Sequence, residues 1–372
     1  MRYFIYRYHP TSIGIKPSDD LTIICPKSLK NKYIELMFLE KNISTVESFE
    51  LADLLIFFDN KDNISDIFTL DEGLITTVGI LKSILTCDRN AWKINLAYKD
   101  KKVMRQQLEG KVVQPKLLDS NSILPEAFMI KPRRESSGKG ILKTSKVPVY
   151  YTNKDYILET VEIFDTMFTC DGIAVDGQIV YFFTHEYIGN ILDIKNNYYN
   201  IIRTNSKYNN DNGLINRLKE KTQIILSNLG TEDVQPFHTE FFYQSTTNRL
   251  SFCEIGKRFG GGNIPLLIKK AFHFDVLETY WQLKNNKHYI PEYTSKPLRY
   301  ASTLAIFQNG KHQSPPAISV EFDYFREYPE KQEIKATSLD DLRYLVSFSV
   351  DSEKELQHIF DELKEYLYEQ RN

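Results

Sequence analysis

The first part of the chain alternates short apolar runs with stretches of helical periodicity. Leu21 to Cys25 and Leu54 to Phe58 are apolar runs of the length expected for buried parallel strands. Side chains from Leu29 to Glu40 recur at helical spacing, and Gly73 to Leu85 predicts a second helix. This alternation predicts a doubly wound α/β domain over residues 1–96.

From about residue 97 the pattern becomes that of mixed α and β structure. A helix is predicted from Lys101 to Leu108, and a polar Gly/Ser loop from Arg133 to Gly140. Asp176 and Gly177 are residue types that favour a hairpin turn. Strands are predicted at Ala127 to Lys131, Tyr156 to Glu159, Phe168 to Val175 and Gln178 to Thr184.

The second half of the chain combines one loop-like stretch with strong helix and hairpin patterns. Ile188 to Gly213 is rich in Asn, Tyr and Lys and predicts a long mobile loop. Helices are predicted from Leu214 to Leu229 and from Pro265 to Leu283, on either side of a strand hairpin from Pro236 to Ile255. The last helix is amphipathic, with an apolar side formed by Leu356, Ile359, Phe360, Leu363 and Leu367.

The hairpin contains two glutamates whose positions suggest a metal site. If it is centred on Thr247, Glu240 faces Glu254 across the ladder. Facing side chains have Cβ atoms roughly 4.5–5.5 Å apart, where like charges destabilise a sheet. A divalent cation would turn this repulsion into coordination, and Mg²⁺ commonly takes one or two carboxylates together with substrate phosphates. The alternative is a slipped register with two solvated glutamates.

A glycine run follows the hairpin directly. Gly260 to Gly262 allow backbone N–H groups to approach a ligand closely, and the helix predicted to begin beyond them would attract anions at its N-terminus. Asn263 is expected to be the N-cap of that helix. Arg258 could hold a carboxylate or phosphate in a bidentate fork. A plain tight turn, which needs only one glycine, is the alternative interpretation.

A third motif joins a lysine to a flexible loop. Lys131 ends a predicted strand just before the Ser/Gly loop, and such loops can fold over a triphosphate with backbone N–H groups and hydroxyls. The loop has no Walker A sequence, and no GxGxxG motif precedes it. Lysines and Gly/Ser turns are common, so this motif by itself is weak.

Composition narrows the class of protein. The chain has 372 residues, of which 42% are hydrophobic and 26% charged, as in ordinary globular proteins of two or more compact units. A formal charge of −2 gives no general reason to bind nucleic acid or an anionic membrane. The four cysteines are widely spaced, and no apolar run is long enough for a signal peptide or a membrane span. A cytoplasmic location is expected.

Taken in order, the motifs from Ala97 to Leu283 resemble the ATP-grasp superfamily, and most of all its amino-acid and small-peptide ligases. Each fragment is common, but their order and spacing together are specific. Asp71-Glu72-Gly73 before a helix is similar to the domain that usually precedes ATP-grasp. The matching series is Asp100-Lys101 with Met104-Arg105, Ile130-Lys131-Pro132, Ile157 to Glu162, Asp171-Gly172, Asp176-Gly177, His238-Thr239-Glu240 and Cys253 to Gly262.

The resemblance implies an ATP-grasp core over residues 97–297, made of two α+β lobes (97–160 and 161–297) with a hinge near 157–162. A C-terminal α/β lobe would occupy residues 298–372. The cofactors would be ATP and Mg²⁺, with Mn²⁺ as an alternative metal. The implied ATP contacts are Lys101, Lys131, Ser136, Ser137, Gly138 and Gly140 at the phosphates and Glu159, Val161 and Glu162 near the adenine and ribose.

The resemblance also implies the metal ligands and the catalytic groups. Glu240 and Glu254 would coordinate Mg²⁺, and Arg258 with Lys131 would act on the reacting groups. Two positions depart from the family pattern: Gly256 replaces a common Asn ligand, and Met167 lies near the place of a ribose-binding acid. Glu162 and Asp165 are possible substitutes for that acid.

The activity implied is ATP-dependent joining of a carboxylate to an amine through an acyl phosphate, with ADP and phosphate released. Small-molecule substrates, an amino acid or peptide, are expected, and a homodimer is compatible with the class. One alternative is a nucleotide-binding partner protein with weakened catalysis. Another is ligation to a protein or ribosomal peptide, with the stretch from Ile188 to Gly213 contacting that partner. His238 is more readily explained as a packed or hydrogen-bonded histidine than as a base.

Overall fold

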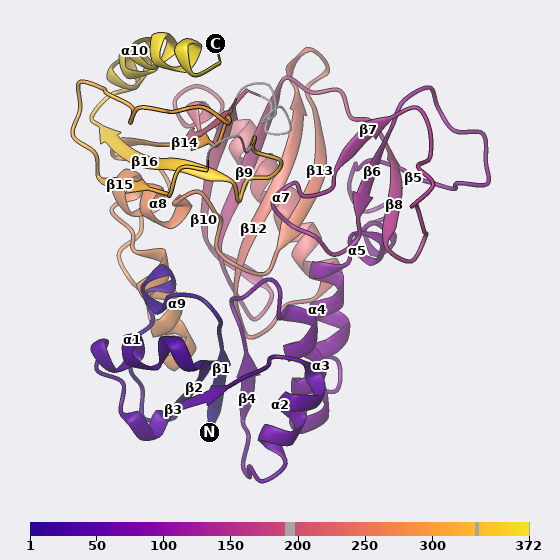
Figure 1. Ribbon diagram of the computed structural model, residues 1–372, viewed down its shortest axis with the longest axis vertical. Helices are drawn as coiled ribbons and strands as arrows, with labels where there is room; N and C mark the ends of the chain where they lie inside the picture. Colours follow the sequence, from indigo (N-terminus) through magenta and orange to yellow (C-terminus); the bar gives the residue numbers. More distant parts are fainter. Residues whose placement is uncertain (190–197, 332–334, 372) are drawn as a thin grey trace.

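The computed structural model describes residues 1–189, 198–331 and 335–371. These residues form three β-sheets with helices packed against them (Figure 1). The N-terminal sheet is parallel, with the strand order β3-β2-β1-β4, which confirms the predicted doubly wound domain. Its elements are β1 (Arg2–Ile5), β2 (Leu21–Pro26), α1 (Lys30–Glu35), β3 (Ile43–Val46), α2 (Leu51–Phe58), β4 (Asp66–Phe68) and α3 (Ile75–Leu85).

The segment Leu54 to Phe58 was predicted to be a strand, and this prediction is wrong, because it lies in α2. Leu54 and Phe58 are buried one helical turn apart, whereas Ile56 between them is 72% exposed. Periodicity cannot assign so short an apolar run to helix or strand. The true neighbouring strands, β3 and β4, are shorter and carry polar residues.

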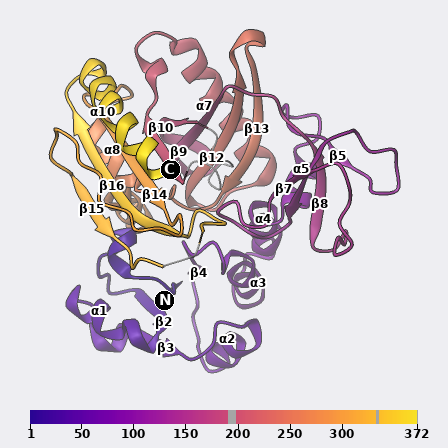
Figure 2. The same cartoon turned by 45° about the horizontal axis from the view of Figure 1, so that its top comes forward.

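The small sheet belongs to a separate lobe beside the N-terminal domain (Figure 2). Its strand order is β5-β8-β6-β7, with antiparallel pairing throughout. The predicted strands ending at Lys131 and Glu159 and the helix at Lys101 are confirmed here. The elements are α4 (Ala91–Lys99), α5 (Lys101–Gln107), β5 (Leu117–Leu118), β6 (Phe128–Pro132), β7 (Leu142–Thr144) and β8 (Tyr156–Thr160).

The large sheet is antiparallel, with the order β13-β12-β9-β10-β11-β14-β16-β15. Its C-terminal strands continue the sheet that begins with the hairpin, so the expected boundary at residue 297 falls within one sheet. The domain boundaries themselves stay a prediction. The strands are β9 (Thr166–Val175), β10 (Gln178–Ile188), β11 (Tyr199–Thr204), β12 (Val234–Gln244), β13 (Arg249–Gly256), β14 (Tyr300–Phe307), β15 (Tyr324–Glu327) and β16 (Leu342–Val350).

The helices of this region cover both faces of the large sheet. The predicted hairpin turn is confirmed, since Asp176 and Gly177 have φ angles of 46° and 82°. The apolar side of the last helix is also confirmed, because its five predicted residues are all buried. The helices are α7 (Asn212–Leu229), α8 (Ile264–Phe272), α9 (Val276–Asn285) and α10 (Glu353–Arg371). None of the helices in the described part of the chain has the length and apolarity to cross a membrane.

The expectation of a long loop from Ile188 to Gly213 is wrong for its second half. Residues 190–197 lie outside the described part of the chain, but Tyr199–Thr204 is the buried strand β11. Its polar residues gave it a loop-like composition. Arg203 is only 4% exposed and pairs with Glu186 of β10 at 3.2 Å, so its charge is compensated inside the sheet.

The single helix predicted from Pro265 to Leu283 is in fact two, α8 and α9. His273, with a φ of 52°, ends α8, and the carboxylate of Asp275 accepts from the Glu278 N–H to begin α9. Asn263 was predicted to cap the helix with its side chain. Instead it has a φ of 60° and donates to Ser347 Oγ at 3.1 Å, which ties the start of α8 to β16.

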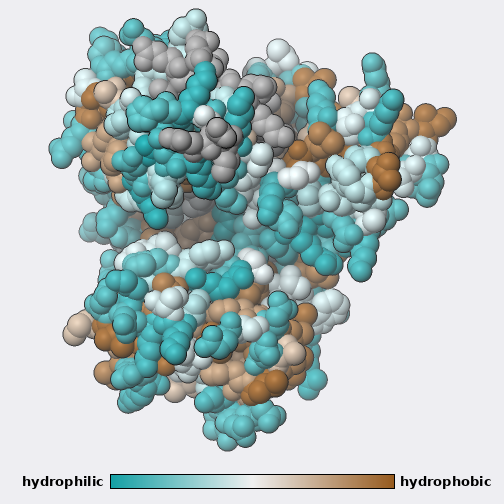
Figure 3. All heavy atoms as spheres, viewed as in Figure 1, coloured by the Kyte–Doolittle hydropathy of each residue, from teal (hydrophilic) through white to brown (hydrophobic). Residues whose placement is uncertain are grey.

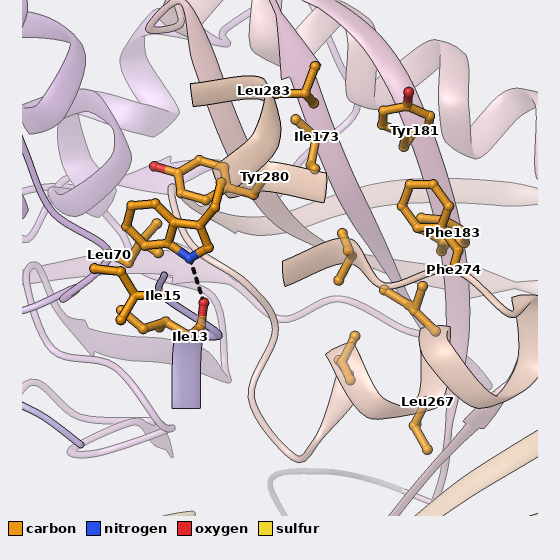
Figure 4. Packing of buried hydrophobic residues seen from close by; sticks show 14 of the residues in the cluster. Ile13, Ile15, Leu70, Ile173, Tyr181, Phe183, Leu267, Phe274, Tyr280 and Leu283 are labelled. Carbon is orange, nitrogen blue, oxygen red and sulfur yellow. Dashed lines mark hydrogen bonds between the residues drawn. The ribbon is translucent and has the colours of Figure 1, made fainter. Parts of the chain in front are cut away.

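An aromatic contact fixes the N-terminal domain to the large sheet region. Trp281 of α9 packs edge-on against Phe4 of β1, with 5.2 Å between ring centroids. Its indole N–H donates to the Ile13 carbonyl at 2.7 Å, drawn as the dashed line in Figure 4. The space-filling view shows a hollow in the surface between the upper and lower parts of the molecule (Figure 3). The contact of Trp281 with Phe4 and Ile13 joins segments far apart in the sequence and so holds the N-terminal domain against α9.

Replacing Trp281 with Phe should destabilise the protein by about 1–3 kcal/mol, because the Ile13 carbonyl loses its donor and the ring leaves a gap. Urea denaturation measures this change. Trp92→Phe is the matched control, since Trp92 is 41% exposed and its loss should cost about 0.5 kcal/mol or less. Equal stability of the Trp281→Phe and Trp92→Phe variants would contradict the role of Trp281 in fixing the N-terminal domain to the large-sheet region.

Candidate active site

The hairpin β12–β13 brings the two predicted metal-binding glutamates together. Glu240 is paired directly with Glu254, and His238 with Gly256. A β-bulge follows at once, between Glu240 and Phe241, so the pairing nearer the turn is shifted by one residue. The predicted register is therefore confirmed at the position where it matters, and both carboxylates leave the same face of the sheet.

Each of these glutamates has its own partners. Glu240 Oε1 accepts a hydrogen bond from the Tyr187 hydroxyl at 2.7 Å and lies 3.7 Å from His238 Nε2. Burial raises the pKa of Glu240. The hydrogen bond and charge of His238 and the hydrogen bond of Tyr187 lower it by more, so the pKa of Glu240 lies below its usual value. Glu254 Oε2 lies 3.3 Å from Lys101 Nζ. Protein cations therefore reduce the repulsion that facing carboxylates would otherwise have.

The donor set is suited to Mg²⁺ rather than to a metal held entirely by protein. Among the described residues, no group of three or more His, Cys, Asp or Glu side chains is placed to hold a metal ion. Two facing carboxylates are nevertheless a common protein contribution to a magnesium–phosphate site, in which phosphate oxygens and water complete the octahedron. Glu240 and Glu254 fit this role, and no described side chain replaces the ligand missing at Gly256.

A buried histidine–aspartate pair lies behind Glu240. Asp171 of β9 accepts from Nδ1 of His238 at 2.7 Å, and His185 Nδ1 lies 3.4 Å from its other oxygen. Burial lowers the pKa of His238, but the Asp171 carboxylate outweighs this and raises the pKa to about 9. His238 is thus hydrogen-bonded to Asp171, as the packed interpretation predicted, and its Nε2 lies 3.7 Å from Glu240.

The glycine run makes room for this pair. A Cβ atom on Gly260 would lie 2.6 Å from Asp171 Oδ1 and 2.9 Å from His238 Nδ1. Gly262 has a left-handed φ of 59°, whereas a Cβ on Gly261 would meet nothing within 4 Å. Close packing therefore explains the glycine at position 260, and the left-handed backbone explains the one at 262. Of the three, only Gly261 borders open space of the kind a ligand would need.

Arg258 lies at a small cavity of about 20 Å³ that is also lined by Lys101, His238 and Glu254. Its Nε donates to Glu72 Oε2 at 2.5 Å, and Lys99 Nζ lies 3.4 Å from the other Glu72 oxygen. Burial raises the pKa of Glu72, but Arg258 and Lys99 lower it to about 2. Glu72 therefore stays ionised and fixes the guanidinium at the mouth of the site.

Lys131 and Glu159, both expected to contact ATP, are joined in a buried ion pair. Lys131 Nζ contacts Glu159 Oε1, and Arg105 Nε lies 3.2 Å from Glu159 Oε2. Arg105 Nη2 also donates to the Cys253 carbonyl at 2.7 Å. Burial raises the pKa of Glu159, but Lys131 and Arg105 lower it by more, so this pKa lies below its usual value. The triad joins the small lobe to the strand that carries Glu254.

The Ser/Gly loop lies over the same region. Lys101 Nζ donates to the Glu135 carbonyl at 2.6 Å, so one ammonium group touches both this loop and Glu254. Ser137 and Gly138 both have left-handed φ angles, 58° and 68°, and a Cβ on Gly140 would lie 2.8 Å from Pro132 Cγ. Ser137 O accepts from the Leu339 N–H at 3.2 Å. The loop thus bridges the small lobe and a C-terminal segment.

The residues after β8 contact the hairpin. Glu162 Oε2 lies 3.1 Å from Arg249 Nη2, and Asp165 accepts from the backbone N–H of Ser245. Val161 is half-buried between β8 and these contacts. Both acids that could replace the missing ribose ligand thus have structural partners, and contact of these residues with adenine or ribose stays a prediction.

Sequence reasoning gave no role to several residues that surround Glu240 and Glu254. Tyr187 and Asp171 contact the glutamate–histidine group from β10 and β9, and Arg105 reaches Glu159 from α5. Asp171 and Arg105 lie inside the series of motifs that resembles ATP-grasp, so their place in that series could have identified them as site residues. Tyr187 had none, because its contact with Glu240 joins strands that are far apart in the sequence.

No family model matches the sequence, and no curated protein matches it. Solved structures do match along nearly the whole chain. An L-amino acid ligase from Bacillus licheniformis is 12% identical, with a TM-score of 0.70, over 98% of this chain and 97% of that one.

Two further structures support the same fold. A carboxyaminoimidazole ribonucleotide synthase from Aspergillus clavatus, complexed with ATP, is 10% identical with a TM-score of 0.70 over 99% of this chain and 98% of that one. A biotin carboxylase from Campylobacter jejuni, also an ATP complex, is 11% identical with a TM-score of 0.58 over 97% and 91%. The predicted ATP-grasp fold is confirmed by these similarities.

The His238–Asp171 pair should make stability depend on pH. Because the folded pKa of about 9 exceeds the model-compound value of 6.5, the contribution is fully present below pH 6.5 and is lost as the pH rises through 9. It is on the order of 3 kcal/mol. Free energies of unfolding measured from pH 6 to 10 should fall in the unmodified protein relative to His238→Gln.

Asp171→Asn should remove most of this pH dependence, because the Asp171 carboxylate raises the pKa of His238. A parallel pH profile for the unmodified protein and His238→Gln would contradict the assignment of a charged His238.

Proposed function

We propose that this chain is an ATP-dependent carboxylate–amine ligase that forms an amide or peptide bond and releases ADP and phosphate. One observation carries the proposal: Glu240 faces Glu254 at a site where Lys101, Arg258 and the Ser/Gly loop converge. Two carboxylates for a metal beside cations for phosphate are the elements that phosphoryl transfer requires. The ATP complexes among the structural neighbours support ATP as the nucleotide.

In the first step, a substrate carboxylate oxygen attacks the γ-phosphorus of ATP, the bond to the β-phosphate oxygen breaks, and ADP leaves. Lys101 and Lys131 would hold the phosphates, and the Ser/Gly loop would cover them and exclude water. Mg²⁺ held by Glu240 and Glu254 would neutralise phosphate charge. Arg258, which donates to Glu72 at 2.5 Å, would hold the carboxylate as the acyl phosphate forms.

In the second step, the nitrogen of an amine attacks the acyl carbon, phosphate leaves, and the amine loses a proton to complete the amide. An amino acid or peptide is our proposed substrate class. The support for this choice is the motif order and the neighbouring fold of an L-amino acid ligase.

A nucleotide-binding protein with weakened catalysis is the second candidate. Gly256 in place of an expected ligand favours it, together with the pairing of Lys101 with Glu254, which a nucleotide would have to loosen. Ligation to a protein, the third possibility, depended on an exposed stretch over Ile188 to Gly213. Within the described part of that stretch, the strand β11 is largely buried and offers little surface to a partner.

Purified protein incubated with ATP, Mg²⁺ and pooled amino acids should release phosphate and form ADP. A phosphate assay with mass spectrometry of the products tests this directly. ATP binding in calorimetry without any ADP formation across a broad carboxylate and amine panel would favour the second candidate instead.

Glu240→Gln should reduce phosphate release about 100-fold or more, because one of the two carboxylates that neutralise the phosphate–metal complex loses its charge. Initial rates at saturating ATP measure the loss. Glu220→Gln on α7 is the control, since that side chain is 62% exposed and pairs only with Lys221 among the described residues. Normal turnover by Glu240→Gln would remove Glu240 from the metal site.

A further inference from the structure

The strand order of the N-terminal sheet creates a topological switch point between β1 and β4. In the order β3-β2-β1-β4, the chain passes from β1 to strands on one side and later returns to β4 on the other side. The loops that follow β1 and β4 therefore separate at their carboxyl ends. Ligands of open α/β sheets bind in this crevice, at the topological switch point.

Arg7 is held rigidly at this switch point. Its Nε donates to Asp71 Oδ2 at 2.7 Å and its Nη2 to Asp71 Oδ1 at 3.0 Å. The Asp71 side chain is fully buried, and its Oδ1 also accepts from the Gly73 N–H at 2.9 Å. A Cβ atom on Gly73 would lie 2.3 Å from Arg7 Nη2. Glycine at this position thus leaves the space that the guanidinium occupies.

The guanidinium retains unused hydrogen-bonding capacity. Arginine has five N–H donors, and the contacts with Asp71 use only Nε and one proton of Nη2. Within the described residues, no acceptor contacts Nη1. The Arg7 side chain is 35% exposed, so it is not sealed in the interior by its partners. The edge formed by Nη1 and Nη2 can bind a carboxylate or a phosphate through two hydrogen bonds.

Arg7 is also linked to the proposed active site. Asp71 holds Arg7, and the next residue, Glu72, holds Arg258 at 2.5 Å. Two guanidinium groups are therefore fixed by consecutive carboxylates, one at the cavity with Glu254 and the other at the end of β1. Tyr8, the next residue, is 56% exposed. The centroid of its ring lies 6.0 Å from the guanidinium carbon of Arg7.

We infer that Arg7 binds an anionic group, a carboxylate or a phosphate, of the amine substrate. This inference rests on the proposed ligase function. An amino acid that donates its carboxylate to the new bond loses that negative charge, whereas the amino acid that supplies the amine keeps its carboxylate. The retained anion needs a cation away from the phosphates, and Arg7 provides one in the N-terminal domain, where Asp71 holds it.

The test compares amine substrates that differ only in their anionic group. Phosphate release is measured with ATP, Mg²⁺ and a fixed mixture of N-acetylated amino acids as the carboxylate substrates. The added amines are amino acids against the corresponding amino-acid amides, and phosphoethanolamine against ethanolamine, in the unmodified protein and in Arg7→Gln. The unmodified protein should prefer the anionic member of a pair. Arg7→Gln should raise KM for that member about 10- to 100-fold and leave KM for the neutral member and for ATP unchanged. The preferred pair tells a carboxylate from a phosphate.

Arg2→Gln is the matched control. Arg2 lies at the other end of β1 and is likewise held by two hydrogen bonds to an aspartate, Asp20, both of 2.7 Å. It should keep the substrate preference. Arg7→Lys retains the charge without the planar fork. It should therefore keep part of the preference for the anionic amine that Arg7→Gln loses. Continued turnover of the neutral amines by Arg7→Gln shows that the variant folds.

The outcomes separate the two proposals. Equal use of anionic and neutral amines by the unmodified protein, or an unchanged preference in Arg7→Gln, overturns the inference about Arg7 alone. Absence of phosphate release from the unmodified protein with every amine overturns the ligase proposal and this inference with it.

Discussion

The pairing of β12 with β13 is the constraint on which the candidate site depends. It places Glu240 opposite Glu254 and sets His238 and Gly256 beside them. A one-residue slip of this pairing would separate the glutamates and turn the neighbouring side chains to the opposite face of the sheet. Phe241 and Phe252 are buried in the hydrophobic core, so packing energy opposes such a slip.

The site is built from cations that are each held by a carboxylate. Lys131 and Arg105 share Glu159, Lys99 and Arg258 share Glu72, and Lys101 lies against Glu254. Burying a charge without a partner costs several kcal/mol, so these pairs allow many charges to lie close together before any nucleotide arrives. They also fix the positions of the cations, which is what positioning and electrostatic stabilisation require of an active site.

Much of this arrangement could be predicted from local sequence, and the failures have physical causes. The facing glutamates followed from counting along one hairpin, and the long helices from their apolar periodicity. Leu54 to Phe58 was misassigned because a short apolar run suits helix and strand equally. Strand β11 was missed because its buried Arg203 is neutralised by Glu186, a partner that only the fold supplies. The contact of Tyr187 with Glu240 likewise depends on strand order, which spacing along the chain does not reveal.

The packing of Trp281 against Phe4 has a consequence for biosynthesis. A nascent chain makes Phe4 and its parallel sheet long before α9 emerges from the ribosome, so one apolar face of that sheet stays uncovered for most of translation. The edge of β11 likewise waits for β14, roughly a hundred residues later. Exposed apolar surface and unpaired strand edges favour aggregation, so the long sequence separation of these partners makes the incomplete chain more prone to aggregate than the finished one.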